Sequence, residues 1–341
     1  MMEREASYAS IILRLLLDGI IDPLEQRTIV WGDLLQIAAQ NGVLIRLVDR
    51  LETIGLEPRH FFFAAVKDMR ARNQRKLALI DRISESCLEN NIDFIFAKIV
   101  QNYPDMTGDI DLYIASRSRQ VDAAILTGLH AVRVKRRLRN LIDGTVNYRL
   151  RQCDSLLEIH HGRVGMLGEH GSYISQVIEN GSHVRVDGNE FLIPSPEDQL
   201  VLQGLQRPVA RSYLRLSDVV TTIGLFRANT LDWNYILKTV TNLNTLYGLS
   251  CYLSFVEKIH RETFKRNLLP DHVVSALALK RTSTIDFKEG FYRFQRIKVG
   301  GRGYVIKFWS AVLSENWAVA SRLSLLPLVA LTTIVRKFRL S

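Results

Sequence analysis

The 341 residues include 47% hydrophobic and 23% charged residues, which is typical of a folded globular protein and argues against a disordered chain. The length is sufficient for two domains. The formal net charge of +10 favours an anionic partner, such as a nucleotide, a nucleic acid or an acidic membrane surface. Three scattered cysteines form no CxxC pair, which argues against a disulfide framework and a structural zinc site and favours the cytoplasm.

The amino-terminal region is predicted to be helical up to about residue 88. Apolar residues recur at three- and four-residue spacing between Tyr8 and Leu16, and Gly42 is expected in the left-handed position after a helix. A longer helix is predicted from about Pro58 to Asn90. The first ten residues, MMEREASYAS, include acidic and polar residues, so we do not expect a secretory signal there.

Strand patterns begin at residue 91, where apolar and aromatic residues start to alternate. A hairpin is predicted to turn at Asp187-Gly188-Asn189, since these residues suit the left-handed positions of a tight turn. The other predicted strands lie within 91–100, 108–115, 128–140, 145–152 and 154–162.

Helices are predicted to resume after Ser195, which can cap a helix that Pro196 begins. The remainder is predicted to be mostly helical, apart from a turn at Gly300, Gly301 and Gly303. That turn lacks the Lys-Ser/Thr of a phosphate-binding loop. The three predicted regions are an N-terminal helical region, 1–88, a strand-rich core, 89–194, and a C-terminal helical domain, 195–341.

The carboxy-terminal region contains Trp309, Trp317 and an uncharged run from Leu323 to Val335, followed by a basic tail. The run has 13 residues, whereas a spanning helix needs about 20. Ordinary helix packing is therefore predicted, and a helix that contacts a membrane surface or a partner protein is the alternative.

Two carboxylates interrupt the apolar pattern of the second predicted strand. Because side chains alternate along a strand, Asp109 and Asp111 are expected on one face and Ile110 and Leu112 on the other. Like charges at such short range repel unless a cation lies between them. Magnesium takes oxygen ligands, and two metal ions can hold the attacking and leaving oxygens of a phosphoryl displacement. A solvated strand edge is the alternative, since an isolated DxD is common.

Neighbouring residues favour the metal hypothesis. Gly108 allows a phosphate to approach the backbone closely. Glu158 lies in an otherwise apolar strand and needs a polar partner, which a metal site could supply. His160 shares the face of Glu158, where it could orient the acids, contact the substrate, or be a polar residue at a strand end. No ligand spacing links His170 to Cys153, so zinc is not expected.

The ordered set of motifs resembles the nucleotidyltransferase superfamily that includes DNA polymerase beta, and more narrowly a large bacterial group of uncharacterised nucleotidyltransferase-like proteins. The resemblance covers most of residues 25–205. It implies an α+β fold, in which a small mixed sheet of the polymerase-beta type is flanked by helical regions. The segments that carry it are, in order, VWGDLLQIAAQNGVLIRLVDRL, FIFAKIV, GDIDLYI, LLEIHHG and IPSPEDQLVL.

The resemblance also implies an activity, which is Mg²⁺-dependent transfer of a nucleoside monophosphate from a nucleoside triphosphate (NTP) to an acceptor. Asp109 and Asp111 would bind the metal ions that carry the triphosphate. Glu158 would complete the second metal site and help to deprotonate the acceptor hydroxyl. Lys98 would contact phosphate, since it lies where the group often has a Lys-Gly pair. The acceptor could be a small molecule, a peptide or protein, or an RNA.

Two alternatives remain open from the sequence. Ile99 follows Lys98 where the group has glycine, and the Gly-Ser phosphate turn of the superfamily is missing. A protein with this fold that binds nucleotide, nucleic acid or a partner protein without catalysis is therefore the second hypothesis. The basic run from Arg133 to Asn140 could bind a triphosphate or a nucleic acid, although a solvated edge is favoured.

Overall fold

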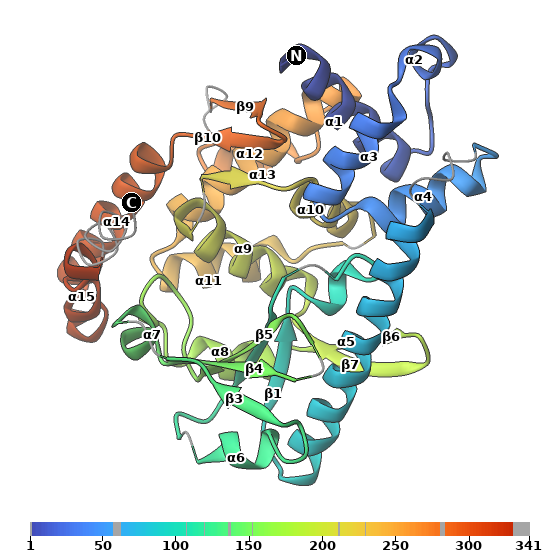
Figure 1. Ribbon diagram of the computed structural model, residues 1–341. Coiled ribbons are helices and arrows are strands. Elements are labelled where there is room, and N and C mark those ends of the chain that lie inside the picture. Colours follow the sequence, from blue (N-terminus) through green and yellow to red (C-terminus); the bar gives the residue numbers. More distant parts are fainter. Residues whose placement is uncertain are drawn as a thin grey trace.

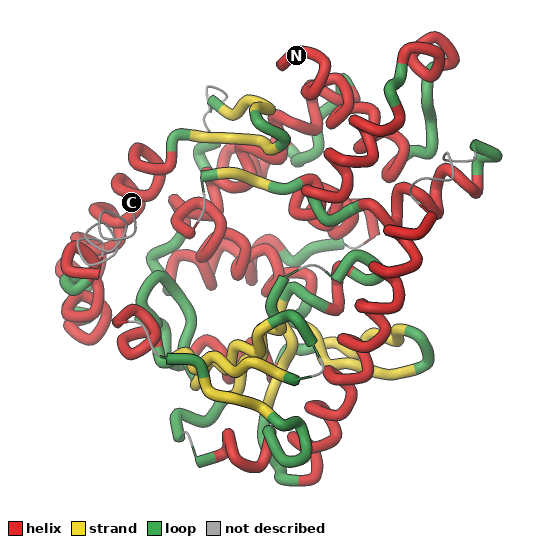
Figure 2. Tube along the Cα trace, viewed as in Figure 1, coloured by secondary structure: helices red, strands yellow, loops and turns green. Residues whose placement is uncertain are grey.

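The protein is described by a computed structural model in which helices surround a small sheet (Figures 1 and 2). Within the described part of the chain, no helix is both long enough and apolar enough to cross a membrane. The described residues are 2–56, 63–106, 108–118, 120–135, 138–151, 153–210, 212–228, 230–279 and 284–329.

The amino-terminal region is helical, as predicted. Gly42 separates α3 from α4 and has a φ of 65°, which confirms the left-handed position expected after a helix. The start predicted for the long helix, near Pro58, lies outside the described residues. The helices are α1 (Met2–Leu17), α2 (Pro23–Thr28), α3 (Trp31–Gln40), α4 (Leu44–Thr53) and α5 (Phe63–Glu89).

The central region forms a five-stranded mixed sheet in the order β1-β2-β5-β4-β3. Strands β2 and β5 are parallel neighbours, and the other pairs are antiparallel. This arrangement confirms the predicted α+β class. The strands are β1 (Phe94–Ala97), β2 (Ile110–Ile114), β3 (Ala131–Arg133), β4 (Thr145–Leu150) and β5 (Leu156–His161).

Two short helices connect these strands, α6 (Val121–Ile125) and α7 (Leu138–Asp143). The residues of α7 were expected to belong to a strand or its edge, so this part of the prediction is wrong. Strand β3 is only three residues long, and α7 begins at Leu138.

The two faces of this sheet differ in character. One face packs against α5, and its core includes Leu112, Ile159 and Ile80. The opposite face carries the polar side chains, because Asp111 pairs in register with Glu158, and Tyr113 with His160. The alternation of side chains along β2 and β5 therefore gives the sheet one buried apolar face and one polar face, which can line a cavity.

The predicted hairpin is confirmed as β6 (Ser182–Val186) and β7 (Asn189–Ile193), and it follows α8 (Tyr173–Glu179). Its turn residues Asp187 and Gly188 have φ values of 48° and 86°. The predicted cap is also confirmed, since Ser195 Oγ accepts a hydrogen bond from the Asp198 N–H at 3.1 Å at the start of α9 (Pro196–Ala210).

The carboxy-terminal region is mainly helical, but it contains a three-stranded sheet in the order β8-β10-β9 that was not predicted. The alternating stretch around the Glu289-Gly290 turn carried a strand signal. The elements are α10 (Leu216–Ala228), α11 (Trp233–Asn242), α12 (Leu246–Phe264), α13 (Asp271–Ala276), α14 (Arg296–Leu313), α15 (Trp317–Leu323), β8 (Tyr213–Leu214), β9 (Ile285–Lys288) and β10 (Phe291–Phe294).

The glycine turn predicted near residue 300 is wrong, because α14 runs through Gly300, Gly301 and Gly303 without a break. A β-carbon on Gly303 would lie 3.3 Å from the ring of Tyr247, so the glycine permits close packing of α14 on α12. Helix contacts outweigh the low helix propensity of glycine at this position.

The amino- and carboxy-terminal helices share one hydrophobic core, in which Ile12 and Leu35 lie with Leu253 and Phe287. Asn41 is fully buried and joins three elements at the end of α3. Its side chain donates to Gly290 O at 2.7 Å and accepts from the Leu216 N–H at 3.0 Å. The three regions predicted along the sequence are therefore packed together in space, and their division into domains stays a prediction.

Candidate functional site

A cavity of about 520 Å³ opens on the polar face of the five-stranded sheet. Side chains of β2, β4 and β5 form its floor. One wall consists of the end of α9 and the start of α10, around Arg207 and Asp218. The other side consists of the loop from Arg163 to Gly168, which follows β5. Three parts of the chain thus enclose the sheet face that carries the carboxylates.

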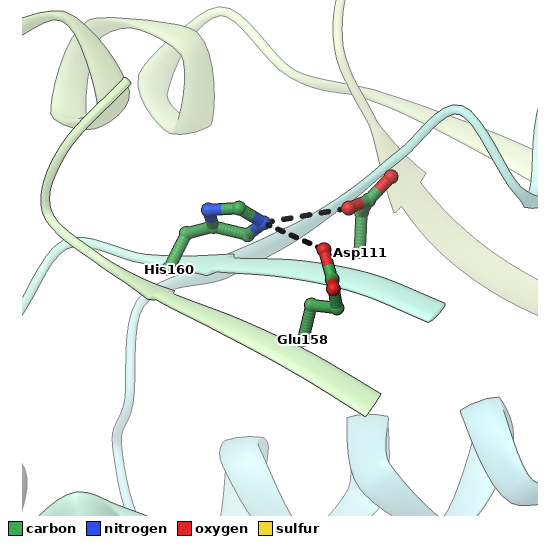
Figure 3. Close-up of side chains that lie close together, drawn as sticks. All are labelled: Asp111, Glu158 and His160. Carbon is green, nitrogen blue, oxygen red and sulfur yellow. Dashed lines mark hydrogen bonds and ion pairs between the residues drawn. The ribbon is translucent and has the colours of Figure 1, made fainter. Parts of the chain in front are cut away.

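Asp111 and Glu158 lie side by side on the cavity floor (Figure 3). They are register partners on the parallel strands β2 and β5, and Lys98 Nζ lies 3.6 Å from Asp111 Oδ2. His160 Nε2 lies 3.3 Å from Asp111 Oδ1 and 3.9 Å from Glu158 Oε2. The sheet register therefore brings together two acids that are 47 positions apart in the sequence.

The two carboxylates differ in their ionisation. Burial disfavours the charged form of Asp111, but the Lys98 ammonium and the His160 hydrogen bond outweigh burial and lower the pKa of Asp111 to about 2. Burial raises the pKa of Glu158, and the charge of Asp111 raises it further. Asn147 Nδ2 donates to Glu158 Oε1 at 2.8 Å, which orients this carboxylate. Of these two acids, Glu158 is therefore the one whose charged form is disfavoured, by burial and by repulsion from Asp111.

Asp109 occupies a different position from the other two acids. It directly precedes β2, is exposed at the cavity, and accepts a hydrogen bond at Oδ1 from the Leu156 N–H at 3.0 Å. Among the described residues, the group whose ligand atoms lie within 4.8 Å of one another consists of Asp111, Glu158 and His160. The structure thus places His160, rather than Asp109, beside the other two acids.

His160 is held in place on both sides. Its ring stacks on that of Tyr113 with centroids 4.2 Å apart and an interplanar angle of 10°. Thr145 Oγ1 lies 3.1 Å from Nδ1, so Nε2 is the nitrogen that faces the carboxylates. Tyr113 in turn accepts a hydrogen bond at its hydroxyl from Gln206 Nε2 at 2.9 Å. The sheet and α9 therefore fix the imidazole through contacts that the sequence did not reveal.

The segment between β1 and β2 is positioned by the amino-terminal helices. Lys76 of α5 donates from Nζ to Met106 O and Gly108 O, both at 2.8 Å. Asp105 is fully buried and accepts from the Ile45 N–H at 2.8 Å, at the start of α4. These contacts explain why the helices before the sheet are needed to place Gly108 at the cavity.

Lys98 ends β1 in an uncommon backbone conformation. Its φ is 71°, a region that residues other than glycine enter at a cost of about 1 kcal/mol or more. The predicted strand over 91–100 therefore ends early, at Ala97. This turn directs the Lys98 side chain toward Asp111. Sequence similarity suggested this lysine, whereas its backbone conformation was not foreseeable.

The helical wall was missed by the sequence analysis. Arg207 of α9 forms a close ion pair with Asp218 of α10, and both line the cavity. Arg215 and Ser217 line it beside them. The basic run from Arg133 to Asn140 behaves differently. Arg133 and Lys135 do not line the cavity, and the side chains of Arg136, Arg137 and Arg139 lie outside the described part of the structure.

The loop after β5 is fixed by α14. Glu169 accepts the Met166 N–H at Oε1 and the Leu167 N–H at Oε2, at 3.1 and 2.9 Å, and it also forms a buried ion pair with Lys307 of α14. Burial opposes the charge of Glu169, but Lys307 outweighs burial and lowers the pKa of Glu169 to about 2. The carboxy-terminal helices therefore stabilise one side of the cavity.

Comparison with known proteins is consistent with this geometry. Residues 27–260 match the family described as Uncharacterised nucleotidyltransferase. The matched range contains the five-stranded sheet, the carboxylates and the α9–α10 wall. A search of curated proteins finds no match to the chain.

Proposed function

Because the chain belongs to this family of uncharacterised nucleotidyltransferases, we propose that it transfers a nucleoside monophosphate from an NTP to an acceptor in a Mg²⁺-dependent reaction. One observation carries the proposal. Asp111 and Glu158 are adjacent on the same face of the sheet, on the floor of a cavity large enough for a nucleotide. If Glu158 lay on the opposite face of the sheet, the two carboxylates could not share a metal ion.

The donor set fits a hard divalent cation. Asp111 and Glu158 provide carboxylate oxygens, which magnesium prefers over nitrogen or sulfur, and the repulsion between them raises the pKa of Glu158. We assign Asp109, Asp111 and Glu158 as the metal ligands, and Asp109 would exchange its hydrogen bond to Leu156 for this role. Bound magnesium would neutralise the phosphate charge that develops during transfer.

The residues around the acids would handle the phosphates and the acceptor. Lys98 Nζ lies 3.6 Å from Asp111 Oδ2 and would bind a phosphate oxygen. Gly108 lines the same cavity and has open space where a β-carbon would lie. Glu158 would also help to remove the proton of the acceptor hydroxyl, which is the role that the resemblance implies for the third carboxylate. His160 would hold both carboxylates from their shared side.

The test combines binding and turnover. Calorimetry with NTP and Mg²⁺ should detect binding to the full chain, and Asp111→Asn should abolish it, whereas Asp68→Asn on the exposed part of α5 serves as the matched control. Incubation of a cell lysate with radiolabelled NTP and the protein should label an acceptor. Absence of magnesium-dependent NTP binding, or equal binding by Asp111→Asn, would contradict the proposal.

A second candidate function is nucleotide binding without transfer. It is favoured by Ile99, which is 2% exposed and occupies the position of the glycine that the related group has after its lysine. The same experiments separate the two functions. Magnesium-dependent NTP binding with no labelled product and no pyrophosphate release would support the binding protein over the enzyme.

A further inference from the structure

The carboxy-terminal helices expose an unusual concentration of large apolar side chains. Fourteen large hydrophobic residues are exposed in the described part of the chain, and seven of them lie between residues 305 and 328. We refer to these seven as the C-terminal apolar surface. They are Val305, Ile306, Trp309, Leu313, Trp317, Leu325 and Leu328.

The α14 part of this surface is one face of the helix. Val305, Trp309 and Leu313 follow one another at intervals of four residues, with Ile306 beside them, so they form a continuous stripe. Trp309 is 56% exposed, Leu313 82% and Trp317, at the start of α15, 64%. The ordinary packing predicted for this region is therefore wrong for both tryptophans.

The opposite face of α14 is anchored to the protein. Lys307 is buried against Glu169, and Ala311 belongs to a small core with Leu323 of α15 and Met166 of the cavity loop. Arg322 of α15 also donates to Ile142 O at 2.6 Å. The exposed stripe thus belongs to a helix that is held against the body of the protein (Figure 1, left).

Most of the net positive charge of the chain belongs to the same part of the sequence. Residues 296–341 contain eight Lys and Arg residues and one acidic residue, so they carry a net charge of +7 out of the +10 of the whole chain. Arg302 is exposed one turn before the stripe. The sequence after the described part includes Arg336, Lys337 and Arg339. Lys307 and Arg322 contact the body of the protein, whereas Arg302 remains exposed next to the stripe. An apolar stripe that carries tryptophan, in a strongly basic part of the sequence, matches the interface of an anionic bilayer.

We propose that the C-terminal apolar surface docks this protein on an anionic lipid bilayer, with α14 lying in the interface. Tryptophan and leucine side chains would enter the headgroup region, while Arg302 binds anionic headgroups. A second copy of the chain is the less suitable occupant, because a twofold interface would bring the same basic region against itself. The inference is independent of the proposed transfer reaction.

The experiment is flotation of the full chain with vesicles of phosphatidylcholine alone or with about one third phosphatidylglycerol. We expect binding to the anionic vesicles only, a blue shift of tryptophan emission on binding, and weaker binding at high salt. Trp309→Glu with Leu313→Glu should lower the bound fraction more than about tenfold. Leu24→Glu, at a site 72% exposed on α2, is the matched control and should leave binding unchanged.

Three outcomes would overturn the inference. The first is no flotation with anionic vesicles, and the second is equal flotation of the Trp309→Glu/Leu313→Glu variant and the wild-type chain. The third is a concentration-dependent dimer that this variant converts to a monomer, which would identify the surface as an interface between copies. Far-ultraviolet circular dichroism of the variant establishes that it is folded, since both substituted side chains are exposed.

Discussion

Charged side chains on the floor of the cavity and at its sides have different neighbours. On the floor, Asp111 and Glu158 are like charges in adjacent positions, and Glu158 retains a raised pKa. At the sides, charges are compensated within the protein, as in the Lys307–Glu169 ion pair. The repulsion between the two carboxylates on the floor can therefore be relieved by a bound cation. The ion pairs at the sides instead stabilise the fold. Substitutions should accordingly affect activity on the floor and stability at the sides.

The largest expected effect is on the floor. Asp111→Asn should lower transfer activity by about a thousandfold or more, because removing a group that neutralises charge at a reacting phosphate costs several kcal/mol in the transition state. The free energy of unfolding should fall by no more than about 2 kcal/mol, because the contacts of Asp111 with Lys98 and His160 are lost. Relief of its repulsion with Glu158 offsets part of this cost. Transfer assays and urea unfolding measure both quantities.

If Asp111→Asn unfolds the protein, the Asp111 carboxylate is a structural group. The activity lost by this variant would then carry no information on the chemistry.

At the side of the cavity, Lys307→Met should lower the free energy of unfolding by about 3 to 5 kcal/mol, because it leaves the buried Glu169 carboxylate without its cation. Urea unfolding measures the effect. Replacing both partners, as Lys307→Met with Glu169→Leu, should recover part of the loss. Lys67→Met at an exposed site on α5 is the control. A cost below about 1 kcal/mol for the single variant would show that the pair is solvated.

The buried groups His170 and Glu169 at the side of the cavity should also make the free energy of unfolding depend on pH. Burial, together with the Lys307 charge, lowers the pKa of His170 from 6.5 to about 3, and the pKa of Glu169 is lowered from 4.5 to about 2. The unfolded chain therefore binds more protons than the folded chain as the pH falls below 6.5. The free energy of unfolding should decrease from that pH downward, first through His170 and then through Glu169.

Urea unfolding at a series of pH values measures this dependence. His170→Asn should flatten the curve between the two pKa values of the histidine, whereas His183→Asn at an exposed hairpin position should leave it unchanged. A stability that rises on acidification would contradict the assignment of His170 as a buried neutral side chain.

The smallest effect is expected for Asn147, which orients the Glu158 carboxylate on the floor of the cavity. Asn147→Ala removes the 2.8 Å hydrogen bond to Glu158 without touching a charge, so transfer activity should fall about tenfold through misorientation of the carboxylate. The free energy of unfolding should fall by about 1 kcal/mol. Asn90→Ala, at the exposed position directly after α5, is the control. A loss as large as that of Asp111→Asn would place Asn147 among the metal or substrate contacts.

Much of the fold was predictable because its signals are local. Alternation in β2 and β5 placed Asp111 and Glu158 on faces opposite Leu112 and Ile159, and the cap at Ser195 follows from short-range hydrogen bonding. Predictions failed where distant packing decided the outcome. Helix α14 continues through its glycines because Gly303 packs against Tyr247, a contact between residues 56 positions apart.

By itself, the sequence determined which residues carry charge and which face of each strand they occupy, since both depend on spacing along the chain. Only the tertiary structure decided that β2 and β5 are adjacent and parallel, that His160 stacks on Tyr113 beside both acids, and that Asp109 is held apart by Leu156. The tertiary structure also decided that Trp309 and Leu313 of α14 are exposed. The physical reason is that strand pairing and helix coverage depend on contacts between distant segments, which local periodicity does not encode.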